Sequence, residues 1–191
     1  MALTLRQLRL RAVWLIVLPF FWFARPSPGV LAAGVMIASF GLMIRAWAAG
    51  TIRKNEVLAT TGPYRYTRNP LFLGSLLIGL GASICGGHWL WPTVFLLFFA
   101  TVYTETIREE ESRLGSLFGE RYREYAAATP ALFPRPGSFN TESSLDRVAA
   151  SEDAGATRVS FSWERYRRNR EWEALLGVIG AFGLLGAKLV F

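Results

Sequence analysis

Residues 29–49 read GVLAAGVMIASFGLMIRAWAA, an apolar run that only Arg45 interrupts, near its end. A helix needs roughly 20 residues to cross the hydrocarbon core of a bilayer, which is about 30 Å thick. This run is long enough to span a membrane, and it predicts an integral membrane protein. Further apolar segments lie along the chain at about 12–24, 71–87, 89–104 and 172–191.

Together these segments predict an all-α fold, a polytopic membrane bundle of about five transmembrane helices. A cytoplasmic helix is expected at about 105–128, after the fourth span, because leucine and aromatic side chains recur there at helical spacing. Residues 138–160 are rich in Ser, Ala, Asp and Glu, which predicts a flexible linker. Residues 161–191 predict a basic, aromatic juxtamembrane helix followed by the last span.

The composition agrees with a membrane protein. Of the 191 residues, 52% are hydrophobic and 18% are charged, whereas a soluble domain usually has about 25% charged residues. The net charge is +7, but the basic residues flank apolar spans, so nucleic acid is not expected as a partner. Cys85 is the only cysteine, and no metal-ligand spacing occurs, so neither a disulfide framework nor a metal site is expected.

Lys and Arg are unevenly distributed between the two ends of the predicted spans. One side carries the arginines before the first span, those of the 51–69 connection and those from 108 to 170. The other side carries only Arg25 and Lys188. The positive-inside rule therefore predicts a cytoplasmic N-terminus and a C-terminus outside, with a bacterial inner membrane as the expected location.

The connection between the second and third spans contains the first group of polar residues, TTGPYRYTRNPLFLG at 60–74. Pro70 suits the first turn of a helix, and Asn69 before it can act as the N-cap. The free N–H groups at that helix start favour an anionic or electron-rich group, and Arg65 and Arg68 add positive charge at the same level. A positive-inside loop with an ordinary helix cap explains these residues equally well.

The helix expected at 105–128 contains the second group, which reads EEESRL at 109–114 and FGERYREY at 118–125. Adjacent carboxylates near a membrane are costly unless cations pair with them. The alternative is a solvated surface helix with ion pairs between residues three or four positions apart. The plausible cationic partners are Arg65, Arg68, Arg108 and Arg113.

The two groups together resemble the motifs of the isoprenylcysteine carboxyl methyltransferase family, which includes the phospholipid methyltransferases. The first family motif, Gly-x-Tyr-x-x-x-Arg-His-Pro-x-Tyr-x-Gly, corresponds to Gly62, Tyr64, Arg68, Asn69, Pro70, Phe72 and Gly74. The second, Glu-Glu-x-x-Leu-x-x-x-Phe-Gly-x-x-Tyr, corresponds to Glu110, Glu111, Leu114, Phe118, Gly119 and Tyr122. The resemblance covers roughly residues 54–136 and includes the helical hairpin between the motifs.

The resemblance implies that residues 1–137 form a membrane catalytic domain that binds S-adenosylmethionine in a cytoplasm-facing pocket. A membrane lipid or another hydrophobic acceptor would enter sideways between helices. The implied catalytic residues are Arg65, Arg68 and Glu110, and the implied substrate-binding residues are Arg108 and Glu111. The implied cofactor-binding residues are Leu58, Ala59, Tyr64, Asn69, Pro70, Leu71, Phe72 and Glu110.

Three departures from the family pattern bear on the substrate. Asn69 stands where the family usually has His, and Phe72 stands where Tyr is usual. Thr106 stands where the prenylcysteine enzymes have an Arg that addresses the substrate carboxylate. A prenylcysteine carboxylate is therefore not the expected acceptor.

Two other functions are compatible with the sequence. One is an NADPH-dependent membrane reductase of the sterol-reductase type, although a nicotinamide phosphate would require more clustered arginines than the first motif offers. The other is a lipid-binding or scaffolding membrane protein without activity, which Phe72 and Thr106 favour somewhat. Binding of S-adenosylmethionine would distinguish the methyltransferase from the reductase.

Overall fold

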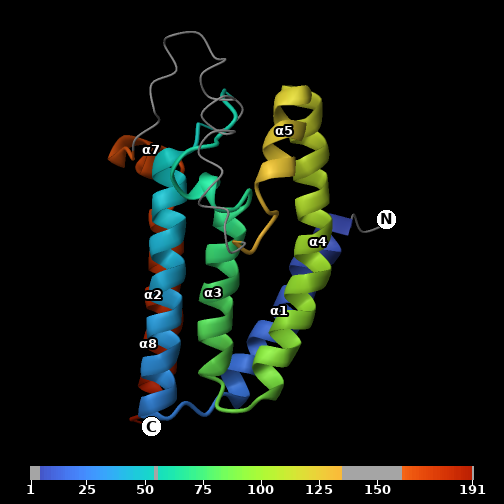
Figure 1. Cartoon of the computed structure of the whole chain (residues 1–191). Helices are drawn as coiled ribbons and strands as arrows, with labels where there is room; N and C mark the ends of the chain where they lie inside the picture. The colour runs from blue at the N-terminus through green and yellow to red at the C-terminus, as the bar shows by residue number, and fades with distance from the viewer. Residues whose placement is uncertain (1–4, 54–55, 135–160, 191) are drawn as a thin grey trace.

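The computed structural model describes residues 5–53, 56–134 and 161–190, and these are helical and contain no strand, as predicted (Figure 1). Most of the linker expected at 138–160 lies outside the described residues. The helices are α1 (Leu5–Phe23), α2 (Pro28–Thr51), the 3-10 helix η1 (Gly62–Arg65), α3 (Pro70–Ile84), α4 (Leu90–Phe118), α5 (Glu120–Ala128), α7 (Trp163–Arg168) and α8 (Trp172–Ala187).

Two of the described helices, α2 and α4, are long and apolar enough to cross a membrane. The second half of α1, together with α3 and α8, is apolar but shorter, so the number of spans stays a prediction. Large apolar side chains cover the outside of the bundle, as Trp22 (80% exposed) and Leu97 (65% exposed) illustrate. A water-soluble protein rarely exposes apolar surface on this scale, so the surface is that of a membrane protein.

Helices α2 and α3 form the centre of the bundle and pack closely along their lengths. Small residues at the interface permit this approach, because a Cβ added at Gly41 would lie 2.6 Å from the carbonyl oxygen of Gly74. A second contact, near the C-terminal end of α3, joins Phe20 of α1, Cys85 after α3 and Leu185 of α8 in an apolar cluster.

Helix α4 continues without interruption through the boundary expected at residue 104. The stretch from Glu105 to Phe118 has good helix formers and contains neither Gly nor Pro before Gly115, so nothing ends the helix where the charged residues begin. The break comes instead at Gly119, whose φ of +57° suits a residue without a side chain. The helix expected over 105–128 is therefore two elements, the second half of α4 and the separate α5.

Residues 161–190, the C-terminal unit, cap two helix C-termini elsewhere in the bundle. At the end of α2, the Arg165 Nε donates to the Gly50 carbonyl at 2.8 Å, and the Asn169 Nδ2 donates to the Ala49 carbonyl at 2.8 Å. At the end of α1, the Lys188 ammonium donates to three carbonyls, including that of Ala24 at 2.8 Å. The last carbonyls of a helix lack partners and favour cations, so these contacts hold the unit against the bundle.

The two ends of the bundle differ in character (Figure 1). The connection between α2 and α3, the helix α5 and the helix α7 lie at one end, and the α3–α4 turn and the C-terminus lie at the other. Both groups of polar residues identified in the sequence are therefore at the same end, at the start of α3 and near the junction of α4 with α5.

Candidate functional site

The loop that leads into α3 is tied to the segment after α5. The Arg68 backbone N–H donates to the Pro130 carbonyl at 2.9 Å, and the Asn69 Nδ2 donates to the Ala131 carbonyl at 2.9 Å. Asn69 occupies the N-cap position of α3, as expected, but its side chain makes no capping bond there. Its amide instead joins the two chain segments, so the loop shape depends on residues 130 and 131.

Arg68 links the first motif to the second. Its Nη1 lies 3.0 Å from a carboxylate oxygen of Glu111 and donates to the Tyr122 hydroxyl at 3.2 Å. Arg68 and Glu111 are 15% and 32% exposed, so this pair is shielded from water more than an ordinary surface ion pair. The Arg68 Nε is buried and has no hydrogen-bond partner among the described residues.

Tyr64 belongs to η1 in the same loop and is only 5% exposed. Its carbonyl accepts a 2.7 Å hydrogen bond from the Tyr125 hydroxyl, whereas its own hydroxyl has no partner among the described residues. Burial raises the pKa of Tyr64, the charges of Glu171 and Glu110 raise it further, and Arg45 opposes them. The phenol therefore stays protonated and is a hydrogen-bond donor without an acceptor in the described part of the chain, which is costly in a buried site unless a ligand supplies one.

The remaining cofactor candidates of the first motif surround the start of α3. Pro70 is fully buried at the first turn of α3, where its missing N–H costs no hydrogen bond. The Leu71 carbonyl accepts a bond from the Ser75 hydroxyl at 2.9 Å, and the Phe72 ring packs edge-on against Tyr103 at 5.2 Å between centroids. Arg65 and Ala59 are half-buried, and Leu58 is buried against Tyr122 and Tyr125.

The adjacent glutamates of α4 pair with different arginines. Glu110 pairs with Arg113 one turn along, at 2.6 Å, and this hydrogen bond raises the pKa of Arg113. Arg108 is 71% exposed and lies 3.7 Å from Glu105. The structure therefore brings Glu111 to the first motif through Arg68, and it leaves Arg108 at the surface.

A charged pair that sequence reasoning missed lies next to the start of α3. Arg45, within α2, donates from Nε and Nη2 to the two carboxylate oxygens of Glu171 at 2.9 Å each. The available signal was the position of Arg45 in an apolar span, because ionisable residues inside membranes are often functional. Its partner could not be inferred, since Glu171 lies 126 positions away.

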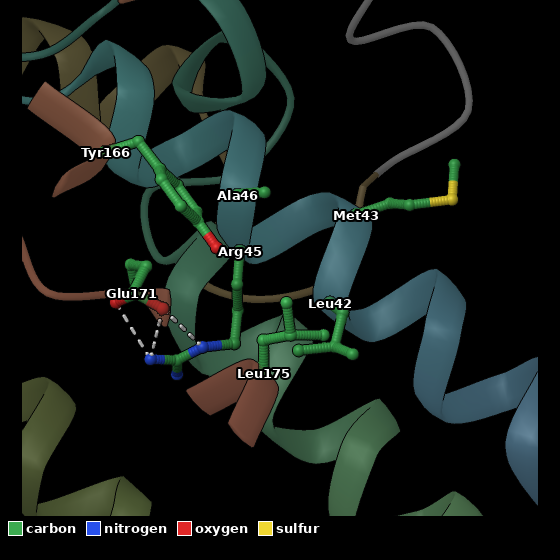
Figure 2. Close-up of a pocket in the computed structure, with 7 residues that line it drawn as sticks. All are labelled: Leu42, Met43, Arg45, Ala46, Tyr166, Glu171 and Leu175. Atoms are coloured by element: carbon green, nitrogen blue, oxygen red, sulfur yellow. Dashed lines mark hydrogen bonds and ion pairs between the residues drawn. The ribbon is translucent and has the colours of Figure 1, made fainter. Parts of the chain in front are cut away.

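A pocket of about 190 Å³ opens beside this pair, between α2 and the C-terminal unit. Figure 2 shows the Tyr166 hydroxyl pointing towards Arg45, with Leu42 and Leu175 beside the Arg45 side chain. The pocket is away from Glu110 but shares Arg45 with the start of α3. Its lining residues are Leu42, Met43, Arg45, Ala46, Tyr166, Glu171 and Leu175.

Comparison with known families agrees with the two motifs. Residues 30–121, which contain both motifs in nearly their full extent, match the model of the phospholipid methyltransferase family. Residues 30–121 are therefore similar to this family. The matched region comprises most of α2, the loop that contains Tyr64 and Asn69, α3, α4 and the start of α5.

The relatives are of two kinds by name, metal-resistance proteins and protein-S-isoprenylcysteine O-methyltransferases. The cobalt-zinc-cadmium resistance protein CzcN of Cupriavidus metallidurans is 40% identical over 119 residues, which cover 61% of this chain and 55% of that protein. The nickel-cobalt-cadmium resistance protein NccN of Alcaligenes xylosoxydans xylosoxydans is 36% identical over 121 residues, with the same coverage. The protein-S-isoprenylcysteine O-methyltransferase of Schizosaccharomyces pombe is 31% identical over 81 residues, which cover 42% of this chain and 34% of that protein.

The chain spans about half the length of the two resistance proteins it matches. No solved structure matches it significantly. Within residues 5–53, 56–134 and 161–190, no group of three or more His, Cys, Asp or Glu side chains is placed to hold a metal ion.

Proposed function

We propose that the protein is a membrane methyltransferase that moves a methyl group from S-adenosylmethionine to a small hydrophobic or lipid-like acceptor at the cytoplasmic face. The observation that carries the proposal is the junction of the two family motifs through Arg68, Glu111 and Tyr122. Residues more than 40 positions apart in the sequence thereby become one site, in a region similar to a methyltransferase family.

The buried polar atoms of the site support a polar cofactor. The Tyr64 hydroxyl and the Arg68 Nε are buried without partners among the described residues. S-adenosylmethionine has carboxylate, hydroxyl and ring-nitrogen acceptors that could satisfy such donors. The half-exposed carboxylate of Glu110 can in turn accept from an ammonium or from ribose hydroxyls, once it exchanges its contact with Arg113.

In this proposal the chain mainly positions the reactants. S-adenosylmethionine, when bound, supplies a methyl carbon that its positive sulfonium has already activated, so little further chemical assistance is needed. Arg68 is engaged by Glu111 and Tyr122, which suits it to holding the loop. Arg65 would orient the acceptor. Tyr64, Asn69, Phe72 and their neighbours would fix the cofactor in line with the acceptor.

The apolar pocket beside Arg45, a residue that contacts the start of α3, supports a lipid-like acceptor. The pocket beside Arg45 has apolar walls formed by Leu42, Ala46 and Leu175, and its rim includes the exposed Met43. A molecule with an apolar tail can reach such a pocket from the bilayer without passing through water.

The proposal is tested by calorimetric binding of S-adenosylmethionine to the detergent-purified full-length chain. We expect micromolar affinity for the wild type and a large loss of affinity in Glu110→Ala. The neighbouring Glu109→Ala is the matched control, because Glu109 is exposed on the same turn and belongs to neither the implied cofactor set nor the implied substrate set.

The same samples are titrated with NADPH, and their thermal unfolding is recorded to show that they are folded. Absence of S-adenosylmethionine binding by the folded wild type would reject the methyltransferase function. Binding of NADPH in that case would favour a reductase, and no binding of either ligand would favour a lipid-binding protein without activity.

A further inference from the structure

Arg45 connects three helices through all of its guanidinium nitrogens. Nε and Nη2 are bonded to Glu171 of the C-terminal unit, and Nη1 donates to the Ser75 hydroxyl at 2.6 Å and to the Leu71 carbonyl at 3.4 Å. Arg45 is 21% exposed and Glu171 is 8% exposed. A planar guanidinium held on both sides in this way has little freedom to move.

The Arg45 side chain also lies directly across α3. A Cβ added at Gly74 would be 2.5 Å from the Arg45 Cγ, so the glycine at this motif position leaves the space that the arginine occupies. Leu71, Gly74 and Ser75 belong to the first two turns of α3, immediately after Asn69 and Pro70. The contact therefore bears on the part of α3 that supports the loop of the first motif.

The same pair lies within electrostatic reach of Tyr64. Glu171 and Arg45 both influence the pKa of the Tyr64 phenol, as Glu110 of the second motif does from α4. Tyr64 therefore responds both to a carboxylate of α4 and to one contributed by the C-terminal unit.

We propose that Glu171 is a positioning residue of the cofactor site, acting through Arg45 on the first two turns of α3. The inference rests on the proposed methyltransferase function. It makes the C-terminal unit part of the active unit, although this unit lies outside residues 30–121, which match the family. Without the carboxylate, the Arg45 guanidinium loses its bidentate anchor and its hold on Leu71 and Ser75 loosens.

The test compares Glu171→Gln with Glu173→Gln in the full-length chain. Glu173 lies on the same turn but is 48% exposed and pairs only with the exposed Arg170 among the ion pairs of the described residues. We expect S-adenosylmethionine to bind about tenfold more weakly to Glu171→Gln, which corresponds to ~1.4 kcal/mol, and with unchanged affinity to Glu173→Gln. Ser75→Ala removes the 2.6 Å contact but keeps the ion pair, so it should also weaken binding even if Glu171→Gln fails to fold.

The double variant Arg45→Gln/Glu171→Gln separates positioning from general stability. Removing one partner of a buried pair leaves an uncompensated charge, whereas removing both does not. We therefore expect the double variant to recover the melting temperature lost in Glu171→Gln without recovering the affinity. The inference would be overturned if the double variant recovered the affinity together with the melting temperature, or if Glu171→Gln and Glu173→Gln bound S-adenosylmethionine equally well. A wild type that binds no S-adenosylmethionine would instead reject the proposed function itself.

Discussion

At the scale of single residues, Tyr64 and Tyr125 show two uses of a buried phenol. Both are almost fully buried, and burial raises the pKa of each above the ordinary value of about 10. The Tyr125 hydroxyl donates to the Tyr64 carbonyl, whereas the Tyr64 hydroxyl has no acceptor within the described part of the chain. The first contact contributes to folding, and the second hydroxyl is available to a ligand.

This contrast gives a prediction about Tyr64→Phe. Because the lost hydroxyl is buried and makes no bond in the described structure, the free energy of unfolding of the unliganded protein should not fall, and it should rise by up to about 1–3 kcal/mol. If this hydroxyl donates to the cofactor, as proposed, the affinity for S-adenosylmethionine should fall several-fold. Thermal unfolding and calorimetry on the same preparation measure the two effects.

Tyr125→Phe is the matched control, and it should lose stability but keep its affinity for S-adenosylmethionine. It removes a buried 2.7 Å hydrogen bond and should cost about 1 kcal/mol of stability. A Tyr64→Phe variant that loses stability but keeps its affinity would contradict the role given to this hydroxyl.

The sequence predicts which kinds of residue meet in the candidate site, but not which arginine pairs with which carboxylate. The acidic cluster of α4 was expected to need arginine partners, and Arg68 and Arg113 do pair with it. Which arginine meets which carboxylate depends on the rotation of α4 against the loop, and no local pattern encodes that rotation. Asn69 illustrates the same limit, because its acceptor, the Ala131 carbonyl, is 62 positions away.

At the scale of elements, apolar runs predict helices well and their ends poorly. A run such as 29–49 has to be helical in a bilayer, because only an intrasegment hydrogen-bond ladder satisfies its backbone. The end of the apolar run does not end the helix, as α4 shows by continuing to Phe118. The helix ends where the backbone requires it, at Gly119, which reads in the sequence only as one residue of a motif.

The caps contributed by the C-terminal unit give a second prediction, about Lys188→Met. Methionine keeps most of the apolar stem but loses the ammonium that donates to the carbonyls of Phe21, Trp22 and Ala24. A cation at a helix C-terminus is worth about 0.3–1 kcal/mol, and up to ~2 kcal/mol in a partly buried position. We expect a loss of about 1 kcal/mol, measured by thermal unfolding in detergent.

Lys188→Arg retains the cation and serves as the control for this variant. It should unfold close to the wild-type temperature. Equal unfolding temperatures for the Met and Arg variants would show that the charge at the end of α1 does not stabilise the bundle.

At the scale of the whole molecule, the arrangement of the helices predicts opposite exposure of two positions. His88 is exposed in the α3–α4 turn, and Glu124 is exposed on α5 near the basic end. With a cytoplasmic basic end, a membrane-impermeant maleimide should label His88→Cys in intact cells and Glu124→Cys only after permeabilisation.

Cys85 is buried, so the labelling is done in a Cys85→Ser background, and this cysteine-free chain sets the baseline. The reverse labelling pattern would show that the basic end faces outward. Labelling of both positions in intact cells would show that the two ends are not separated by a membrane.

The caps and ion pair of the C-terminal unit also bear on how the protein is made. A ribosome produces residues 161–190 after α1, α2 and α3, so Arg45 has no Glu171, and the ends of α1 and α2 have no caps, until these residues are made. A chain interrupted between residues 134 and 161 would keep a cation without its carboxylate in a membrane helix, which is costly. A segment synthesised after the helices that it caps therefore closes the bundle, so chains that lack it differ from those that contain it in a way that cellular proteolysis can act upon.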